Sequence, residues 1–175
     1  MPDVFTPAKR SEVMSRIRSR GNAATEGRLV ALMKAARITG WRRQVAIRFQ
    51  VSGSKLQAQV AARRKRVRNL KPETLNLKPT KSVRPDFVFR RERVVVFVDG
   101  CFWHGCPRHA TRPMQNRKFW DAKLTRNKAR DAQVSRGLRK AGWKVLRIWE
   151  CALTVKRQPA TLNRLRRALG MEHGL

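Results

Sequence analysis

Residues 98–109 (VDGCFWHGCPRH) contain two Cys, two His and one Asp, which are residue types that bind metals or transfer protons. Cys101-x4-Cys106-x2-His109 places three possible zinc ligands on one short segment, and Cys151 follows a later β-rich segment. Four Cys or His ligands with no open position describe a closed tetrahedral zinc site. The spacing differs from the common Cys-x2-Cys pattern, so three unrelated buried thiols and a surface His are the alternative.

The other His of this segment, His104, is not needed as a zinc ligand. It lies between Cys101 and Cys106 and is expected near two acids, Asp86 and Asp99. An imidazole placed beside carboxylates can act as a general base near neutral pH. The alternative is a solvated loop His with no chemical role.

Acids are scarce in this chain, with 11 Asp and Glu against 42 Lys and Arg, so their positions are informative. Asp86 begins a β-rich segment directly after Pro85, where a surface salt bridge would be unusual. A buried carboxylate beside a backbone carbonyl suits Mg²⁺, which keeps several waters and recruits substrate phosphate. The sequence therefore favours metal-assisted phosphodiester hydrolysis, with His104 positioning or deprotonating the attacking water.

A predicted β-hairpin brings these groups together. The β-rich segments 86–89 and 94–98 flank the polar residues 90–93, which we expect to form the turn. Residue 89 then pairs with residue 94, and residue 86 lies opposite residue 97. Asp86 is therefore predicted beside the backbone of Phe97 and Val98, with Asp99 at the end of the strand.

The other predicted elements complete a mixed α/β domain that spans residues 1–175. Apolar spacing and end signals predict a basic helix over 8–20 and a helix that starts at Thr25 and ends at Gly40, with Trp41 in the core. They also predict a helix over 116–141, a strand over 143–149 and a final helix over 161–169. We find no internal repeat.

Residues 51–84 differ from the rest of the chain, because they hold ten Lys and Arg and a single acid. The charge run and two prolines predict a basic, flexible insertion at about 51–82. Two interpretations are compatible: a solvated loop, and an arm that becomes ordered on nucleic acid.

The formal net charge of +31 opposes compaction unless a polyanion neutralises it, which indicates a nucleic-acid partner. No apolar run approaches the roughly 20 residues of a membrane span, and the N-terminus lacks a signal-peptide pattern. We therefore expect no membrane partner and a cytoplasmic protein, associated with the nucleoid when bound to DNA.

Several motifs resemble those of the very short patch repair (Vsr) endonucleases. They are RSEVMSRIRSRGNAATEGRL, RPDFVF, VDGCFWHGCPRH, NRKFWDAKLTRNKARD and GWKVLRIWECAL, which occur in this order across residues 8–50 and 82–155. The resemblance implies a restriction-endonuclease-like α/β fold, with a mixed central sheet flanked by helices and a structural zinc site. It also implies a bacterial, monomeric enzyme that nicks double-stranded DNA 5′ of the thymine in T:G mismatches left by deaminated 5-methylcytosine.

The resemblance assigns roles to individual residues. Asp86 is implied as the Mg²⁺-binding carboxylate, the Val98 carbonyl as a second Mg²⁺ contact, and His104 as the general base. Asp131 is implied as an outer acid, and Glu26 matches a glutamate near the catalytic centre. The implied Zn²⁺ ligands are Cys101, Cys106, His109 and Cys151, and the implied aromatic wedges into DNA are Phe102, Trp103 and Trp120.

The chain departs from the family pattern at Asp99, where the best-known member has His. Asp99 is thus either a second metal carboxylate or a hydrogen-bond partner of His104. The zinc ligands near Cys101 also differ in type and spacing, and the basic insertion is longer than the expected connector. Mismatch-repair proteins and a cognate cytosine-5 methyltransferase system are further partners that the resemblance suggests.

Two alternative functions follow from the same residues. One is a catalytically silent, zinc-containing DNA-binding protein, which would have no use for Asp86. The other is a related restriction-like nuclease of different specificity, which would cut paired and mismatched duplexes equally.

Overall fold

The structure is a computed structural model that describes residues 23–50, 80–109 and 116–171, together with Thr6, Lys9 and Glu12. The helix predicted over 8–20 and the basic residues 51–79 lie outside these described ranges. The helices of the described residues include none that is both long and apolar enough to cross a membrane.

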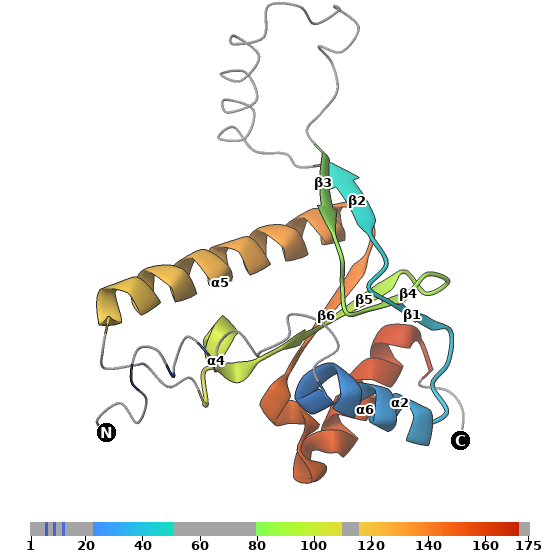
Figure 1. The fold of residues 1–175 in the computed structure, drawn as a ribbon. Helices are drawn as coiled ribbons and strands as arrows, with labels where there is room; N and C mark the ends of the chain where they lie inside the picture. Colours follow the sequence, from blue (N-terminus) through green and yellow to red (C-terminus); the bar gives the residue numbers. More distant parts are fainter. Residues whose placement is uncertain are drawn as a thin grey trace, which may run out of the picture.

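A four-stranded mixed sheet in the order β1-β4-β5-β6 forms the centre of the molecule (Figure 1). β1 (Trp41–Arg43) and β5 (Val94–Asp99) both pair antiparallel with β4 (Phe87–Phe89), and β6 (Lys144–Trp149) pairs parallel with β5. Three successive Val begin β5 and all are buried, as expected for a strand covered on both faces.

The register of the predicted hairpin is confirmed. Phe89 pairs with Val94 and Phe87 pairs with Val96, so the turn is formed by residues 90–93. Continuing this register by one residue places Asp86 opposite Phe97. The carboxylate of Asp86 consequently reaches the backbone of the next residue, Val98, as the sequence predicted.

Helices cover both faces of the sheet (Figure 1). On one face, α2 (Arg28–Ala35) and α6 (Gln158–Leu169) pack with Phe87, Phe89 and Val96 in one core cluster. On the other face, α5 (Arg117–Lys140) contributes Leu138 to a second cluster with Val88 and Val95. The predicted mixed α/β class, with a mixed sheet flanked by helices, is confirmed.

α5 also supplies the connection that a parallel strand pair requires, because β5 and β6 cannot be joined by a tight turn. The chain leaves β5 through the short helix α4 (Cys101–His104), crosses the sheet along α5, and returns in β6. The 3₁₀ segments η3 (Glu150–Leu153) and η4 (Val155–Arg157) then lead into α6.

A separate two-stranded antiparallel ribbon extends from the sheet (Figure 1). It consists of β2 (Ile47–Gln50) and β3 (Thr80–Val83), and its side chains alternate between buried and exposed in β2. Residues 80–82, which we predicted as the end of a flexible insertion, are therefore part of a strand.

Three predicted helix ends were wrong. A π-helical turn, η1 (Ala23–Gly27), precedes α2, and α6 begins at Gln158 with Pro159 in its first turn. α2 ends well before Gly40, because Arg37 adopts a left-handed φ of 54° and Ile38 N–H donates to Met33 O at 2.8 Å. This pattern is a Schellman C-cap, in which Arg37 occupies the position where glycine is usual.

Candidate active site and metal centre

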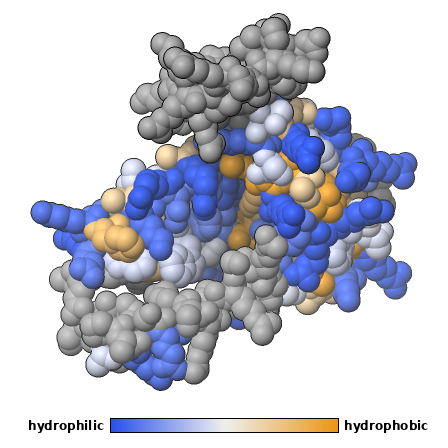
Figure 2. Space-filling view, turned by 45° about the horizontal axis from the view of Figure 1, so that its top comes forward, coloured by the Kyte–Doolittle hydropathy of each residue, from blue (hydrophilic) through white to orange (hydrophobic). Residues whose placement is uncertain are grey.

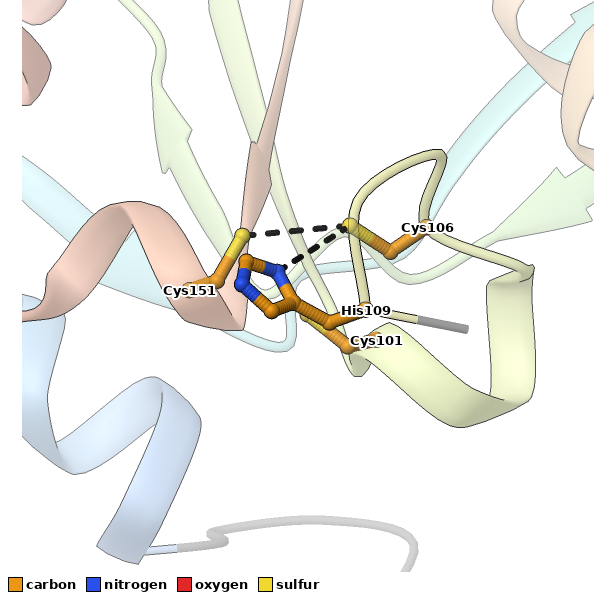
Figure 3. A group of neighbouring side chains, drawn as sticks. All are labelled: Cys101, Cys106, His109 and Cys151. Carbon is orange, nitrogen blue, oxygen red and sulfur yellow. Dashed lines mark hydrogen bonds between the residues drawn. The ribbon is translucent and has the colours of Figure 1, made fainter. Parts of the chain in front are cut away.

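The four predicted zinc ligands lie together (Figure 3). The possible ligand atoms of Cys101, Cys106, His109 and Cys151 all lie within 4.8 Å of one another. The Cys106 Sγ atom is 3.8 Å from Cys151 Sγ and 3.9 Å from His109 Nδ1. Thiolates bound to one tetrahedral zinc at about 2.3 Å lie about 3.8 Å apart, so the donor set fits a zinc ion.

Burial and hydrogen bonds shift the pKa values of two thiols in this cluster in opposite directions. Burial raises the pKa of Cys101 to about 12. Burial also opposes ionisation of Cys106, but hydrogen bonds from the Arg108 backbone and from His109 outweigh it and lower the pKa of Cys106 to about 6. A bound cation would favour ionisation of every thiol in the cluster, because zinc binds thiolate rather than thiol.

The cluster joins two elements that are distant in sequence. Cys101 begins α4 at the end of β5, and Cys151 lies in η3 at the end of the parallel strand β6. The Cys101 N–H also donates to a Glu150 carboxylate oxygen at 3.2 Å. The site therefore connects the ends of the two central strands, beside the residues predicted to be catalytic.

Asp86 is held rigidly at the start of β4. Its Oδ2 accepts a 2.7 Å hydrogen bond from the Val98 N–H, and its Oδ1 lies 3.4 Å from the Gln44 side-chain amide. A residue within a β-strand directs its N–H and C=O to the same edge, so the Val98 carbonyl also points toward Asp86. A carboxylate oxygen and a carbonyl oxygen are therefore available side by side.

Glu26 from the π-helical turn approaches the same position. Its Oε2 accepts hydrogen bonds from Arg43 at 2.6 Å and from the Gln44 amide at 3.5 Å. One amide group thus contacts the carboxylates of both Glu26 and Asp86. Hard oxygen ligands of this kind suit Mg²⁺, which needs only one or two protein carboxylates.

The charge state of Asp86 reflects this crowding. Burial is the largest cause that raises the pKa of Asp86, hydrogen bonds from Val98 and Gln44 lower it, and the nearby carboxylates of Glu26 and Asp99 raise it. Together these effects bring the pKa to about 6. The neighbouring carboxylates repel one another when they are ionised, and a bound divalent cation would offset that repulsion.

His104 and Asp131 form a short hydrogen-bonded contact. The His104 Nδ1 atom lies 2.6 Å from Asp131 Oδ2. Burial opposes the charge on Asp131, but His104 and Arg147 outweigh it and lower its pKa, so Asp131 is a carboxylate and accepts the hydrogen bond. The Nδ1 atom of His104 therefore carries the proton, and in the neutral ring the lone pair lies on Nε2.

Asp99 is engaged mainly by Arg147 from the neighbouring strand. Both of its carboxylate oxygens accept hydrogen bonds from the guanidinium, at 2.6 and 2.5 Å, and His104 Nδ1 lies 3.6 Å away. Burial would lower the pKa of Arg147, but Asp99 and Asp131 outweigh it and raise it. Arg147 thus fixes the two acids that surround the imidazole.

The three predicted wedge residues lie in one aromatic cluster between α4 and α5. Phe102 stacks edge-on against Trp103 and Trp120, with ring centroids 5.1 Å apart in both pairs. Phe119, which is 53% exposed, extends the cluster beyond Trp120. The ammonium of Lys123 lies 5.3 Å from the ring centroids of both Trp103 and Trp120.

Sequence reasoning missed two residues of this site. Gln44 gave no signal, because its role depends on a turn that brings it against Asp86 and Glu26. Arg147 did carry a signal, since it is a charged residue within the otherwise apolar run VLRIW of a central strand. Such a residue indicates a buried carboxylate partner.

Comparison with known proteins confirms the resemblance drawn from the motifs. A family model described as DNA mismatch endonuclease Vsr matches residues 78–110, which include the hairpin and the start of the cysteine cluster. The nicking enzyme V.NaeI of Lentzea aerocolonigenes is 53% identical over 68 residues, covering 39% of this chain and 41% of the relative.

Two further relatives agree. The nicking enzyme V.NmeDIP of Neisseria meningitidis serogroup C is 40% identical over 94 residues, covering 53% of this chain and 63% of the relative. DNA mismatch endonuclease Vsr of Escherichia coli K12 is 42% identical over 71 residues, covering 40% of this chain and 46% of the relative. The matched part of this chain spans less than two thirds of each relative.

Proposed function

We propose that this protein is a Mg²⁺-dependent DNA endonuclease that nicks one strand 5′ of the thymine in a T:G mismatch. The observation that carries the proposal is the position of Asp86. This half-buried carboxylate accepts a hydrogen bond from the Val98 N–H and shares the Gln44 side-chain amide with Glu26. It also lies near Asp99, which is 3.6 Å from the His104 ring that contacts Asp131. The relatives described above carry the names of nicking and mismatch endonucleases, which agrees with this chemistry.

Asp86 and the Val98 carbonyl would hold Mg²⁺, with Glu26 completing the acidic side of the site. Mg²⁺ bound there would lower the pKa of water and offset the charge on the scissile phosphate. Arg43 donates a hydrogen bond to Glu26, and the Gln44 amide contacts both carboxylates, so both are oriented by neighbouring side chains.

His104 is the proposed general base. Asp131 holds the Nδ1 proton, so Nε2 is free to accept the proton of the attacking water. Asp99 and Arg147 position Asp131 and the imidazole rather than contact substrate, because both Asp99 oxygens already accept hydrogen bonds from Arg147. The leaving 3′ oxygen would take its proton from solvent or from the Mg²⁺ hydration shell.

The aromatic cluster would provide the mismatch preference. Phe102, Trp103 and Trp120 are half-buried side chains beside the catalytic residues, and a mispaired step is the least costly to open. A wedge of this kind offsets lost base stacking. A monomer that acts on cytoplasmic DNA, downstream of a cytosine-5 methyltransferase and together with mismatch-repair proteins, is part of the same proposal.

A nicking assay tests the proposal. The protein is incubated with Mg²⁺ and matched duplexes that carry T:G or T:A at one position, and the strand products are separated on a denaturing gel. We expect a nick 5′ of the mismatched thymine, its loss in Asp86→Ala, and its retention in Asp121→Asn. Asp121 is the matched control, since it is an acid paired with Arg117 on α5.

The outcomes separate the alternatives. Equal cutting of T:G and T:A duplexes would indicate a restriction-like nuclease of other specificity. Binding without cutting at any salt concentration would indicate a DNA-binding protein. Full activity of Asp86→Ala would remove the proposed site even if the protein cuts DNA.

A further inference from the structure

The β2–β3 ribbon is connected directly to the candidate active site. Gln44, which contacts Asp86 and Glu26, lies three residues before β2, and Asp86 lies three residues after β3. The Gln44 N–H also donates to the Asp86 backbone carbonyl at 3.3 Å. The start of β2 and the end of β3 therefore both lie within three residues of the Gln44–Asp86 contact.

The ribbon is packed against the C-terminal part of α5. Ile47 and Phe49 belong to the same buried cluster as Leu138. Phe49 lies so close to Gly137 that a Cβ atom there would meet its ring at 2.1 Å, so only glycine permits this contact. On the same side, Lys81 Nζ donates to Gln133 Oε1 at 2.7 Å. The base of the ribbon is therefore a fixed part of the domain.

A pocket of about 410 Å³ lies where the ribbon meets the end of α5. Exposed Arg48 and Lys140 contribute its cations, Gln50 and Thr80 contribute neutral polar groups, and Phe49 forms part of the wall. The sequence has no acid in residues 47–50, 80–85 or 132–149, so no carboxylate of these elements opposes the positive charge. Hydrophilic side chains dominate the face drawn in Figure 2, which is hollowed in its middle.

The negative end of the α5 dipole does not cancel this charge. Arg93 donates hydrogen bonds to the carbonyls of Ala141 at 2.7 Å and Gly142 at 3.1 Å, and its guanidinium stacks on Trp143. A cation at a helix C-terminus offsets the partial negative charge of the last carbonyls. The exposed cations of the pocket thus remain available to an anion.

We propose that Arg48 and Lys140 form a second phosphate-binding surface, which holds the DNA backbone to one side of the nicking site. The proposal rests on the proposed function for the identity of the duplex. Nine residues of α5 separate Asp131 from Lys140, which corresponds to about 14 Å at 1.5 Å per residue. Phosphates along one strand are spaced by about 3.4 Å along the duplex axis. With α5 aligned along that axis, the contact falls about four nucleotides from the nick.

The test measures DNA affinity against salt with a T:G duplex of about 24 base pairs, without Mg²⁺. Each lost phosphate contact reduces the slope of log K against log salt by about 0.9, so Arg48→Ala/Lys140→Ala should reduce it by about 1.8. Between 50 and 200 mM salt, wild type should therefore lose about twelvefold more affinity than the variant. Arg48→Lys/Lys140→Arg should restore the wild-type slope, because it keeps both charges.

Position is tested by replacing single phosphates with uncharged methylphosphonates, two to eight nucleotides from the nick on each strand. Wild type should lose affinity at one or two positions near the fourth nucleotide, and the double-Ala variant should be insensitive there. The control, Lys156→Ala/Arg166→Ala, removes two exposed cations from η4 and α6. It should keep the sensitivity of wild type.

Three results would overturn the proposal: an unchanged slope in the double-Ala variant, an equal decrease in the control variant, or methylphosphonate sensitivity confined to the phosphates at the nick. Circular dichroism and zinc content establish that each variant is folded. Failure of the proposed nuclease activity is a separate outcome. If wild type does not nick DNA but the double-Ala variant has a reduced salt slope, the phosphate-binding surface is still supported.

Discussion

Replacing Asp86 with Asn should make the metal-free fold more stable while abolishing nicking. In the fold the pKa of Asp86 is raised from 3.8 to about 6, chiefly by burial. The folded protein therefore binds a proton at Asp86 more tightly than the unfolded chain does. The stability of wild type consequently decreases as pH rises through the window from about 4 to about 6.

The size of the effect follows from the shift. A shift of roughly two pKa units corresponds to about 3 kcal/mol at 1.36 kcal/mol per unit, which is the largest gain that Asn could give above pH 7. Asn can still accept the Val98 hydrogen bond but more weakly than a carboxylate, so we expect a gain of about 1–3 kcal/mol at pH 8. The gain should shrink toward pH 4, where Asp86 is protonated in the fold.

Urea unfolding of zinc-loaded wild type and Asp86→Asn, in buffer free of Mg²⁺, measures this difference at pH 4.5, 6 and 8. Adding Mg²⁺ at pH 8 should stabilise wild type more than Asp86→Asn, because the variant lacks the Asp86 carboxylate. Asp121→Asn should match wild type in its pH dependence and in its stabilisation by Mg²⁺, because it keeps Asp86. Two results would refute the reasoning that an ionised Asp86 destabilises the metal-free fold. One is an Asp86→Asn variant that is less stable than wild type at pH 8, and the other is a gain in stability that does not depend on pH.

Three other predictions concern zinc, proton transfer and the ribbon. Elemental analysis should find about one zinc per chain in wild type and a clear loss in Cys151→Ser, accompanied by a lower melting temperature; retained zinc would exclude Cys151 as a ligand. His104→Ala should slow single-turnover nicking by about 10²–10⁴-fold with DNA affinity nearly unchanged, and Asp131→Asn should slow it less. A His104→Ala variant that nicks as fast as wild type would argue against His104 as the general base. Gly137→Ala should lower the free energy of unfolding by about 1–3 kcal/mol, because the added methyl group overpacks against Phe49. Adding Phe49→Leu should recover part of this loss in the double variant. Additive effects of the two substitutions would mean that the residues do not touch.

The hairpin was predictable because its determinants are local. Two β-rich segments separated by a four-residue turn predict the pairing of Phe89 with Val94, and that register places Asp86 against Val98. The clustering of the predicted zinc ligands could be foreseen for a different reason. The chain has only three Cys, so a site that needs several thiolates has few ways to form.

Helix ends were less predictable. The sequence predicts that the helix ends at Gly40, but α2 is terminated at Arg37, whose residue type does not indicate a left-handed backbone. The ribbon was missed in part because a strand of four residues at the edge of a basic segment has little pattern of its own. Its position depends on the packing of Phe49 against Gly137 of α5, a contact between residues 88 positions apart in sequence.

The sequence by itself determined which groups are available for chemistry: few acids, three thiols, three imidazoles and a large positive charge. The tertiary structure decided how these groups are coupled. It set Gln44 between two carboxylates, gave Asp131 rather than Asp99 the short contact with His104, and used Arg147 to fix both acids. These pairings depend on the sheet register and on the path of α5, because a hydrogen bond requires atoms to approach within about 3 Å, whereas sequence patterns locate residues only on an element.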